Sequence, residues 1–270
     1  MDNARVLALF DAQMRRDAPP DVATTRVERV GGVVRQYGAG AHEWTGVLWS
    51  DLDESTADAA IAEQLSWLDA PQGAGREFEW KLYAHDRPAD LGDRLLAAGF
   101  TPEPPESLMV ADATEIIDAL GDVELPDGVT LRTVTDRSGV DLMAEVHERA
   151  FGTSAARLRE RLLDQLARQS ATVSMVLAMA GDAPVCGARL ELCPGTEFAG
   201  LWGGGTVKEW RGKGIYRALI AHRARLARSA GYRYLQVDAS DQSAPILERL
   251  GFTCLSVTTP YLRESRAQPR

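Results

Sequence analysis

The stretch that decides the fold of this chain is residues 203–252, GGGTVKEWRGKGIYRALIAHRARLARSAGYRYLQVDASDQSAPILERLGF. A basic, glycine-containing loop at 211–216 leads into an amphipathic helix over about 215–230, and Gly231 stands where a C-cap glycine belongs. We expect Arg217, Arg223, Arg225 and Arg228 to supply much of the polar surface of this helix. A strand over 234–239 and a short helix over about 243–250 follow. Consecutive backbone N–H groups at a helix N-terminus bind anions, and glycine lets a phosphate approach the main chain. The loop is therefore a predicted phosphate site.

Two other phosphate motifs do not fit this stretch. A P-loop needs glycine and then Ser or Thr at the positions of Val207 and Gly214. A dinucleotide fingerprint GxGxxG fails because Lys208 stands where its third glycine would be. These mismatches disfavour kinase-like and NAD-dependent functions. The remaining alternative to a phosphate site is an ordinary strand-to-helix turn with solvated bases.

The residues before this stretch alternate between helical and strand patterns. The pattern predicts a strand over 129–134, helices over 139–151 and 155–168, and strands over 171–180, 185–193 and 198–207. Turn signals at 181–184 and 194–196 join the last three strands, so we expect antiparallel pairs. The segment 121–128, GDVELPDG, lacks both periodicities and is the predicted linker.

The first half of the chain repeats the ending of the second. A strand-like segment over 78–84 and a helical one over 88–98 end at Gly99-Phe100-Thr101, as the later helix ends at Gly251-Phe252-Thr253. The match predicts a weak internal duplication. After its strand over 44–49 the first half has acids, Asp51, Asp53 and Glu54, where a phosphate loop would lie, followed by a helix over 57–68. We expect this half not to bind the same anion.

Length, composition and charge restrict the classes of function that this chain can have. A length of 270 residues predicts two domains, and 45% hydrophobic residues supply material for their cores. The net charge of −9 disfavours a nucleic-acid partner, although residues 126–270 carry a small basic excess. No apolar run reaches the ~18 residues of a membrane span, and the first residues do not resemble a secretory signal, so we expect a cytoplasmic protein. Three cysteines, Cys186, Cys193 and Cys254, lack metal spacing, and we expect no metal and three buried thiols.

A known family combines these features. Arg211-x-x-Gly214 after a strand, the helix to Gly231, the strand to Asp238 and Leu250-Gly251-Phe252 resemble the acetyl-CoA-binding core of the GNAT superfamily of N-acetyltransferases. The resemblance covers about 128–260, and the first half is similar to a second, degenerate unit. It implies an α/β fold of two tandem GNAT-like domains, each a mostly antiparallel mixed sheet flanked by helices. The domains would be 1–122, without a CoA loop, and 128–270, the N-acetyltransferase domain.

The resemblance also implies which residues hold acetyl-CoA, the cosubstrate. The loop amides would bind its pyrophosphate, and the end of the preceding strand would pair with its pantetheine arm. The three glycines at 203–205 fit this role because they permit a bulge and close approach of another backbone. The implied cofactor-binding residues are Gly205, Thr206, Val207, Arg211, Gly212, Lys213, Gly214, Ile215, Tyr216, Ser240 and Ser243.

Two departures from the family pattern concern the loop and the catalytic acid. Tyr216 occupies a loop position that is normally small. Leu247 stands where many members carry the tyrosine that protonates the departing thiolate. Tyr216, Tyr261, Ser240 and Ser243 are alternative acids, and Ser243 can instead cap its helix.

Two carboxylates on strands are candidate bases. Glu191 shares a strand face with Arg189, which favours solvent exposure or an ion pair over a catalytic role. Asp238 ends its strand, where capping the next turn is an equal alternative. The catalytic candidates are therefore Glu191, Asp238 and Tyr216.

These observations predict transfer of an acetyl group from acetyl-CoA to a primary amine, by direct attack in a ternary complex. The alternative is an acyl-CoA-binding or assembly protein without turnover, which the leucine at 247 favours. The acceptor would be a small-molecule or peptide amine, with neither nucleic acid nor a membrane as partner. The sequence leaves a homodimer open.

Overall fold

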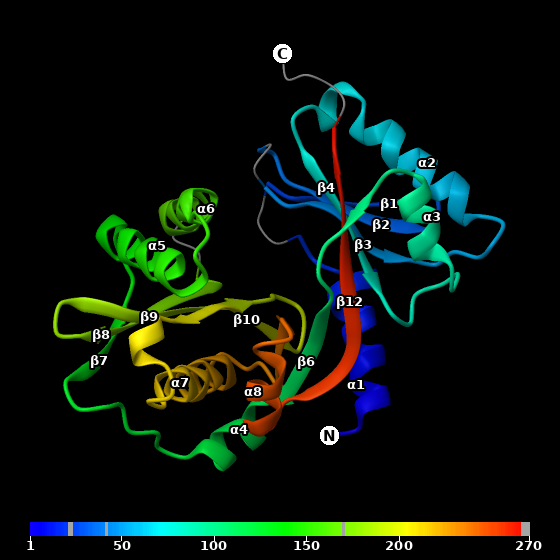
Figure 1. Ribbon diagram of the computed structural model, residues 1–270. Coiled ribbons are helices and arrows are strands. Elements are labelled where there is room, and N and C mark those ends of the chain that lie inside the picture. The colour runs from blue at the N-terminus through cyan, green and yellow to red at the C-terminus, as the bar shows by residue number, and fades with distance from the viewer. Residues whose placement is uncertain (21–23, 41–42, 169–170, 266–270) are drawn as a thin grey trace. The chain divides into compact units, whose positions relative to one another are not determined.

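The computed structural model describes residues 1–20, 24–40, 43–168 and 171–265. The chain forms two compact units, each a sheet flanked by helices (Figure 1). Unit 1 contains Met1–Met109, Asp238–Pro245 and Cys254–Arg270, and unit 2 contains Val110–Val237 and Ile246–Thr253. The predicted fold class, a mixed α/β chain with mostly antiparallel sheets, is confirmed.

The sheet of unit 2 follows the chain order. Its strands are β7 (Val129–Thr133), β8 (Val173–Ala180), β9 (Ala183–Leu192), β10 (Phe198–Thr206) and β11 (Tyr234–Ala239). The pairs from β7 to β10 are antiparallel, as the short turns predict, whereas β10 and β11 are parallel. Helices α5 (Arg137–Phe151) and α6 (Ala156–Ala167) lie on one face, and α7 (Ile215–Ser229) lies on the other (Figure 1).

Strand β10 changes its pairing near its end. A bulge between Trp202 and Gly205 shifts its register against β9, as the glycines at 203–205 predict. Its parallel pairing with β11 extends over Phe198–Gly200 and Tyr234–Gln236. Beyond these pairs β10 continues to Thr206, so its last residues approach the loop that leads into α7.

Local sequence explains the helices of unit 2. Helix α5 begins after Asp136, whose side chain accepts a hydrogen bond from Gly139 N at 2.7 Å, and it ends at Gly152 in the left-handed conformation. Helix α7 contributes Ile215 and Leu219, four residues apart, to the core of the unit. Because these residues are buried in the core, they fix the position of α7 within unit 2, and with it the position of the loop at its start.

Unit 1 is built on β1 (Arg26–Val30), β2 (Val33–Tyr37), β3 (Thr45–Ser50), β4 (Glu77–Tyr83) and β12 (Thr253–Glu264), in this order, with β5 (Thr101–Pro102) on β12. Helices α2 (Ala57–Leu68) and α3 (Leu91–Ala97) pack on one face through a buried apolar cluster. The chain begins with α1 (Asn3–Phe10) and a π-helical turn, Asp11–Arg16.

Strand β4 separates two environments in unit 1. Phe78 and Trp80 point into the apolar core with α2 and α3. Because strand side chains alternate, Glu79, Lys81 and Tyr83 share the opposite face. There the ring of Tyr83 meets Phe10, with the ring centroids 6.0 Å apart. One face of β4 is thus apolar and the other carries ionisable groups.

In the described part of the chain, the remaining elements are two short turns, one strand and two helices. They are 3₁₀ turns at Pro71–Gly73 and Lys208–Trp210, strand β6 (Glu106–Asp112), and helices α4 (Ala113–Leu120) and α8 (Ala244–Arg249). The predicted linker 121–128 contains no helix or strand. The compact units are not continuous in sequence as the expected domains 1–122 and 128–270 are, because β12 pairs with β4.

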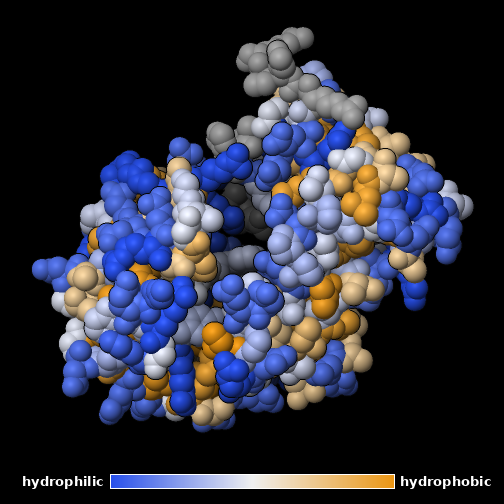
Figure 2. Space-filling model, viewed as in Figure 1, coloured by the Kyte–Doolittle hydropathy of each residue, from blue (hydrophilic) through white to orange (hydrophobic). Residues whose placement is uncertain are grey.

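Two expectations about burial are wrong. Arg223, expected on the polar surface of its helix, is 1% exposed. Of the three cysteines expected to be buried, Cys186 is buried, Cys193 is partly exposed and Cys254 is exposed. The face in Figure 2 is mostly hydrophilic, with small groups of hydrophobic residues between. Among the described residues, no helix has the length and apolar character to cross a membrane.

Candidate functional site

The predicted anion loop lies between β10 and α7. Gly212 and Gly214 have φ of 75° and 82°, in the left-handed region that favours glycine. A Cβ at either position would meet nothing within 4 Å, so the backbone conformation and not a lack of space requires glycine. Gly214 is the N-cap of α7 and, in the described part of the chain, no side chain caps this end. The first amides of the helix are left for an external acceptor.

The two bases of the loop, Arg211 and Lys213, are exposed, but their roles differ. Arg211 donates from Nε to Thr206 O at 3.0 Å and from Nη2 to Ala150 O at 2.8 Å. Its guanidinium therefore fixes the loop to the end of β10 and to α5. Lys213 extends over the Trp210 ring, with Nζ 4.3 Å from the centroid, and contributes positive charge at the helix start.

The glycines at the end of β10 are closely packed on both faces. A Cβ on Gly204 would lie 2.7 Å from Cε2 of Tyr216, and one on Gly205 would lie 2.6 Å from Cε2 of Phe151. Larger residues would displace these rings. Glycine leaves room for these rings against the backbone of β10. The tyrosine at the normally small position 216 therefore packs directly on Gly204.

Tyr216 adjoins a buried group of polar side chains. Burial raises its pKa, so its hydroxyl keeps its proton at neutral pH. Arg223 donates to Leu219 O and Arg189 O at 3.1 and 3.0 Å, while its Nη2 has no partner among the described residues. The Cys186 thiol lies 3.1 Å from Thr206 Oγ1, and burial raises its pKa to about 11. This cysteine stays a thiol at neutral pH.

Both carboxylates predicted as bases have cationic partners. Glu191 Oε1 accepts from Arg189 Nε at 2.9 Å, so of the two roles expected from their shared strand face the ion pair is the one observed. Arg189 itself is buried. Asp238 accepts a hydrogen bond from Lys81 Nζ through Oδ2. Either carboxylate would have to compete with its cation to act as a base, and their catalytic roles stay predictions.

The other predicted site residues lie in the β11–α8 segment and on β12. Ser240 and Ser243 bond to each other in the turn before α8, with their oxygens 3.2 Å apart. Leu247 is fully buried on α8. Tyr261 packs against the apolar core of unit 1, and burial raises its pKa. An apolar side chain thus fills the position of the usual acid.

An aspartate, Asp53, bonds the turn that precedes α2 in unit 1. Asp53 Oδ1 accepts hydrogen bonds from the backbone N–H groups of Ser55 and Thr56, both at 2.9 Å. These contacts, with those of the two hydroxyls, lower the pKa of Asp53. Asp53 thus stabilises the turn that leads into α2, and the expectation that this half binds no CoA stays a prediction.

The sequence did not indicate a group that we call the charge cluster: Glu79 and Lys81 of β4, Glu106 of β6 and Asp238 of β11. The alternation of β4 places Glu79 and Lys81 on one face, but nothing near Glu106 in sequence marks it. Burial, with the charges of Asp238 and Glu79, raises the pKa of Glu106 to about 7. Burial alone would lower the pKa of Lys81, but the Asp238 charge raises it above its ordinary value.

Within residues 1–20, 24–40, 43–168 and 171–265, no three His, Cys, Asp or Glu side chains group as metal ligands would.

Comparison with known proteins identifies the fold of the whole chain. Residues 140–252 match the Acetyltransferase (GNAT) family. No curated protein sequence matches the chain. A GCN5-related N-acetyltransferase from Kribbella flavida is 16% identical with a TM-score of 0.66, covering 97% of this chain and 95% of that one.

Two further solved structures agree with this fold. One from Sphaerobacter thermophilus, also a GCN5-related N-acetyltransferase, is 17% identical with a TM-score of 0.57, covering 88% of this chain and 78% of that one. A tandem GNAT protein from the clavulanic acid biosynthesis pathway is 16% identical with a TM-score of 0.61, covering 96% and 93%. The predicted tandem fold is confirmed.

Proposed function

We propose, from the match of residues 140–252 to the Acetyltransferase (GNAT) family, that the protein transfers an acetyl group from acetyl-CoA to a primary amine. The observation that carries the proposal is the uncapped N-terminus of α7, with Gly212 and Gly214 in left-handed conformations and Lys213 beside it. Amides, helix dipole and lysine charge together suit the pyrophosphate of CoA.

Direct attack by the amine agrees with the side chains near this loop. A route through an acetylated cysteine would need a thiolate, and burial keeps Cys186 protonated. Cys193 and Cys254 lie elsewhere, on the turn after β9 and on β12. An amine that attacks the thioester itself needs only a base, oriented reactants and a proton for the leaving sulfur.

A specific observation favours the second candidate, an acyl-CoA-binding protein without turnover. The buried Leu247 replaces the usual acid, and both predicted bases are ion-paired. A thiolate of pKa near 8.5 can take its proton from water, so this substitution does not by itself abolish transfer. Turnover separates the two functions.

Binding is tested by calorimetric titration with acetyl-CoA. We expect one site per chain, and on the order of tenfold weaker binding for Lys213→Glu, because a repelling carboxylate replaces a cation at the phosphate site. Arg157→Glu makes the same charge change at an exposed position of α6 and should bind like the unaltered protein. Dephospho-CoA, which keeps the pyrophosphate, should show the same dependence on Lys213. Equal affinities of the two variants would refute the loop assignment.

Turnover is tested by CoA thiol release with a panel of primary amines. Amine-dependent release with amide formation supports the transferase. Loop-dependent binding without release from any amine supports the binding protein instead.

A further inference from the structure

Unit 1 contains a serine, a histidine and an aspartate that hydrogen bonds join in a row, and we call Ser256, His85 and Asp11 the triad. Ser256 Oγ lies 2.8 Å from His85 Nδ1, and His85 Nε2 lies 2.9 Å from Asp11 Oδ2 and 3.2 Å from Asp11 Oδ1. A hydroxyl, an imidazole that accepts its proton and a carboxylate that orients the imidazole together form an activated nucleophile. The triad has the residue types and the contacts that this chemistry requires.

The three residues come from separate segments of unit 1. Asp11 begins the π-helical turn after α1, His85 lies in the turn after β4, and Ser256 lies on β12. A backbone hydrogen bond of 2.8 Å from Ala84 N to Val257 O joins the β4 turn to β12, next to His85 and Ser256. Because main-chain contacts fix both segments, the histidine and the serine are held facing each other.

A buried arginine positions the carboxylate of the triad. Arg15 Nη1 donates to Asp11 Oδ1 at 2.7 Å and lies 3.3 Å from His85 Nε2, and Arg15 Nη2 donates to both oxygens of Asp86. Burial acts to raise the pKa of Asp11, but hydrogen bonds with His85 and Arg15 lower it below its ordinary value, so this carboxylate is charged at neutral pH. A charged carboxylate favours the imidazole proton on Nε2, which leaves Nδ1 to accept from Ser256.

Solvent reaches the triad. The side chains of His85 and Asp11 are 31% and 24% exposed, and Ser256 is partly exposed. The serine hydroxyl also lies 3.5 Å from Val257 O, so the histidine nitrogen is its closer acceptor. Asp11 and Asp86 bring two carboxylates to one guanidinium, and the remaining negative charge disfavours an anionic reagent. A neutral reagent from solution is therefore the kind that this serine suits.

We propose that Ser256 is a nucleophile, with His85 as its general base and Asp11 as a positioning residue, and that the protein hydrolyses small neutral aryl esters of carboxylic acids. Aryl esters suit a single serine and imidazole because a phenolate leaves more readily than an alkoxide. This activity belongs to unit 1 and uses neither CoA nor an amine, so it goes beyond the proposed acetyl transfer.

The reaction balances in two steps. The Ser256 hydroxyl gives its proton to His85 Nδ1, and the oxygen lone pair forms a bond to the acyl carbon. The bond between the acyl carbon and the aryl oxygen breaks, and the phenolate takes the electron pair and the proton from His85. Water then gives a proton to His85 and bonds the acyl carbon, while the serine oxygen leaves with its electron pair and regains that proton. One water is consumed, and the products are a carboxylic acid and a phenol.

The first test is labelling of the full chain with a fluorophosphonate, which bonds an activated serine oxygen and releases fluoride. We expect mass spectrometry to find the label on Ser256 and to find none there in Ser256→Ala. His85→Gln should be labelled on the order of 10²–10⁴-fold more slowly, because a general base contributes about this factor. An unlabelled Ser256 in the unaltered protein, or equal rates with and without His85, would overturn the proposal.

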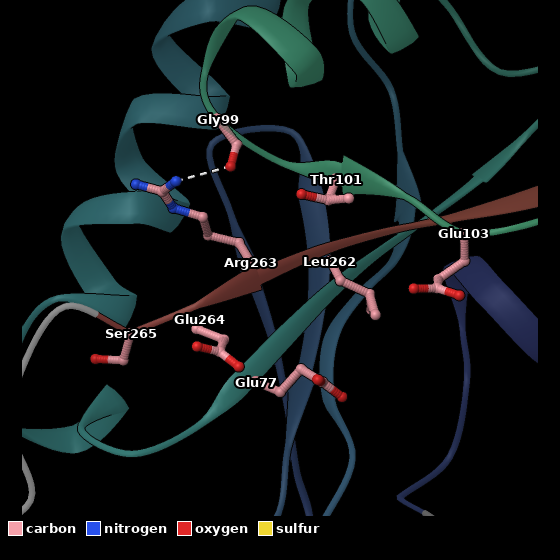
Figure 3. Close-up of a pocket in the computed structure, with 8 residues that line it drawn as sticks. All are labelled: Glu77, Gly99, Thr101, Glu103, Leu262, Arg263, Glu264 and Ser265. Carbon is pink, nitrogen blue, oxygen red and sulfur yellow. Dashed lines mark hydrogen bonds between the residues drawn. The ribbon is translucent and has the colours of Figure 1, made fainter. Parts of the chain in front are cut away.

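A second serine of unit 1 supplies the matched control. Ser265 follows β12 and lines a hollow of about 510 Å³, and the eight residues drawn around it include no histidine (Figure 3). Its hydroxyl donates to Leu68 O at 3.0 Å. Ser265→Ala should leave the labelling rate of Ser256 unchanged, and Ser265 itself should carry no label. Similar labelling of both serines would show that the probe follows exposure alone, against the proposal.

Asp11→Asn tests the positioning role with little change of shape. Arg15 donates at the Oδ1 position, so the amide nitrogen takes the Oδ2 position and donates to His85 Nε2. The imidazole proton then moves to Nδ1, which no longer accepts from Ser256. We expect slower labelling, and ¹⁵N NMR at about pH 8 should place the proton on Nε2 in the unaltered protein and on Nδ1 in the variant. A proton on Nδ1 in the unaltered protein would overturn the proposal.

Turnover is measured with p-nitrophenyl acetate, without CoA or amine. The exposed thiol of Cys254 can react with this ester, so the assay uses Cys254→Ala, with and without Ser256→Ala. Release of nitrophenolate should continue beyond one molecule per chain and should fall to the rate in buffer when Ser256 is replaced. Release that stops at one molecule per chain, or that persists without Ser256, refutes the hydrolysis and leaves the acetyl transfer untouched.

Discussion

Replacing Arg15 by Met is expected to lower the free energy of unfolding by about 3–5 kcal/mol, measured by urea denaturation. The Arg15 side chain is 2% exposed and makes two hydrogen bonds to Asp86, of 2.8 and 2.7 Å. It also bonds Asp11 at 2.7 Å and lies 4.0 Å from the Tyr83 ring centroid. Methionine fills a similar volume but leaves the buried Asp86 without its cation.

An exposed ion pair of the same unit supplies the control. Arg29 and Asp17 are 57% and 54% exposed, so Arg29→Met should cost less than about 1 kcal/mol. Equal losses for the two variants would mean that the Arg15 contacts contribute nothing beyond a surface pair.

The pH dependence of the Arg15 effect follows from Asp11. Burial would raise its pKa, but hydrogen bonds from His85 and Arg15 lower it below the ordinary value. A depressed carboxyl pKa stabilises the fold above the unfolded-state pKa, and this stability is lost as the pH falls through the folded-state pKa. The difference between Arg15→Met and the unaltered protein should therefore shrink on acidification below about pH 4.

The second large effect is expected for Lys81→Met. Removing the ammonium leaves Asp238 buried and charged, and we expect a loss of about 3 kcal/mol at pH 8. The loss should be smaller at pH 5. The charge of Lys81 opposes the rise in the pKa of Glu106, so without Lys81 this pKa rises further, and a carboxyl with a raised pKa costs stability as the pH rises.

A double variant tests whether the pair itself is responsible. Lys81→Met with Asp238→Asn removes both charges and should be more stable at pH 8 than Lys81→Met alone. A double variant that loses the sum of the two single losses would show that Lys81 acts through its packing and not through Asp238.

Local patterns predicted the elements around the loop well. Strand β11 has its predicted bounds, 234–239, and helix α7 begins at Ile215 as expected. Left-handed backbone conformations favour glycine, and Gly212 and Gly214 of the loop adopt them. The anion loop could therefore be recognised before its geometry was seen.

The failures have a common physical cause, which is pairing between distant residues. Strand β12 extends to Glu264 because β4 pairs with it over seven residue pairs, and no local pattern of the sequence marks that pairing. Arg223 lies eight residues after Ile215, on the buried stripe of α7, but its charge suggested a surface. Lys81 and Asp238 are 157 residues apart, so no local spacing marks their ion pair.

The pairing of β12 with β4 also affects how the protein is made. The ribosome synthesises β1 to β4 early, but the strand that continues their sheet emerges only after the whole of α7 and β11. Until then the free edge of β4 is open to strands of other chains. Unit 1 therefore completes its sheet late in synthesis although most of its residues come first.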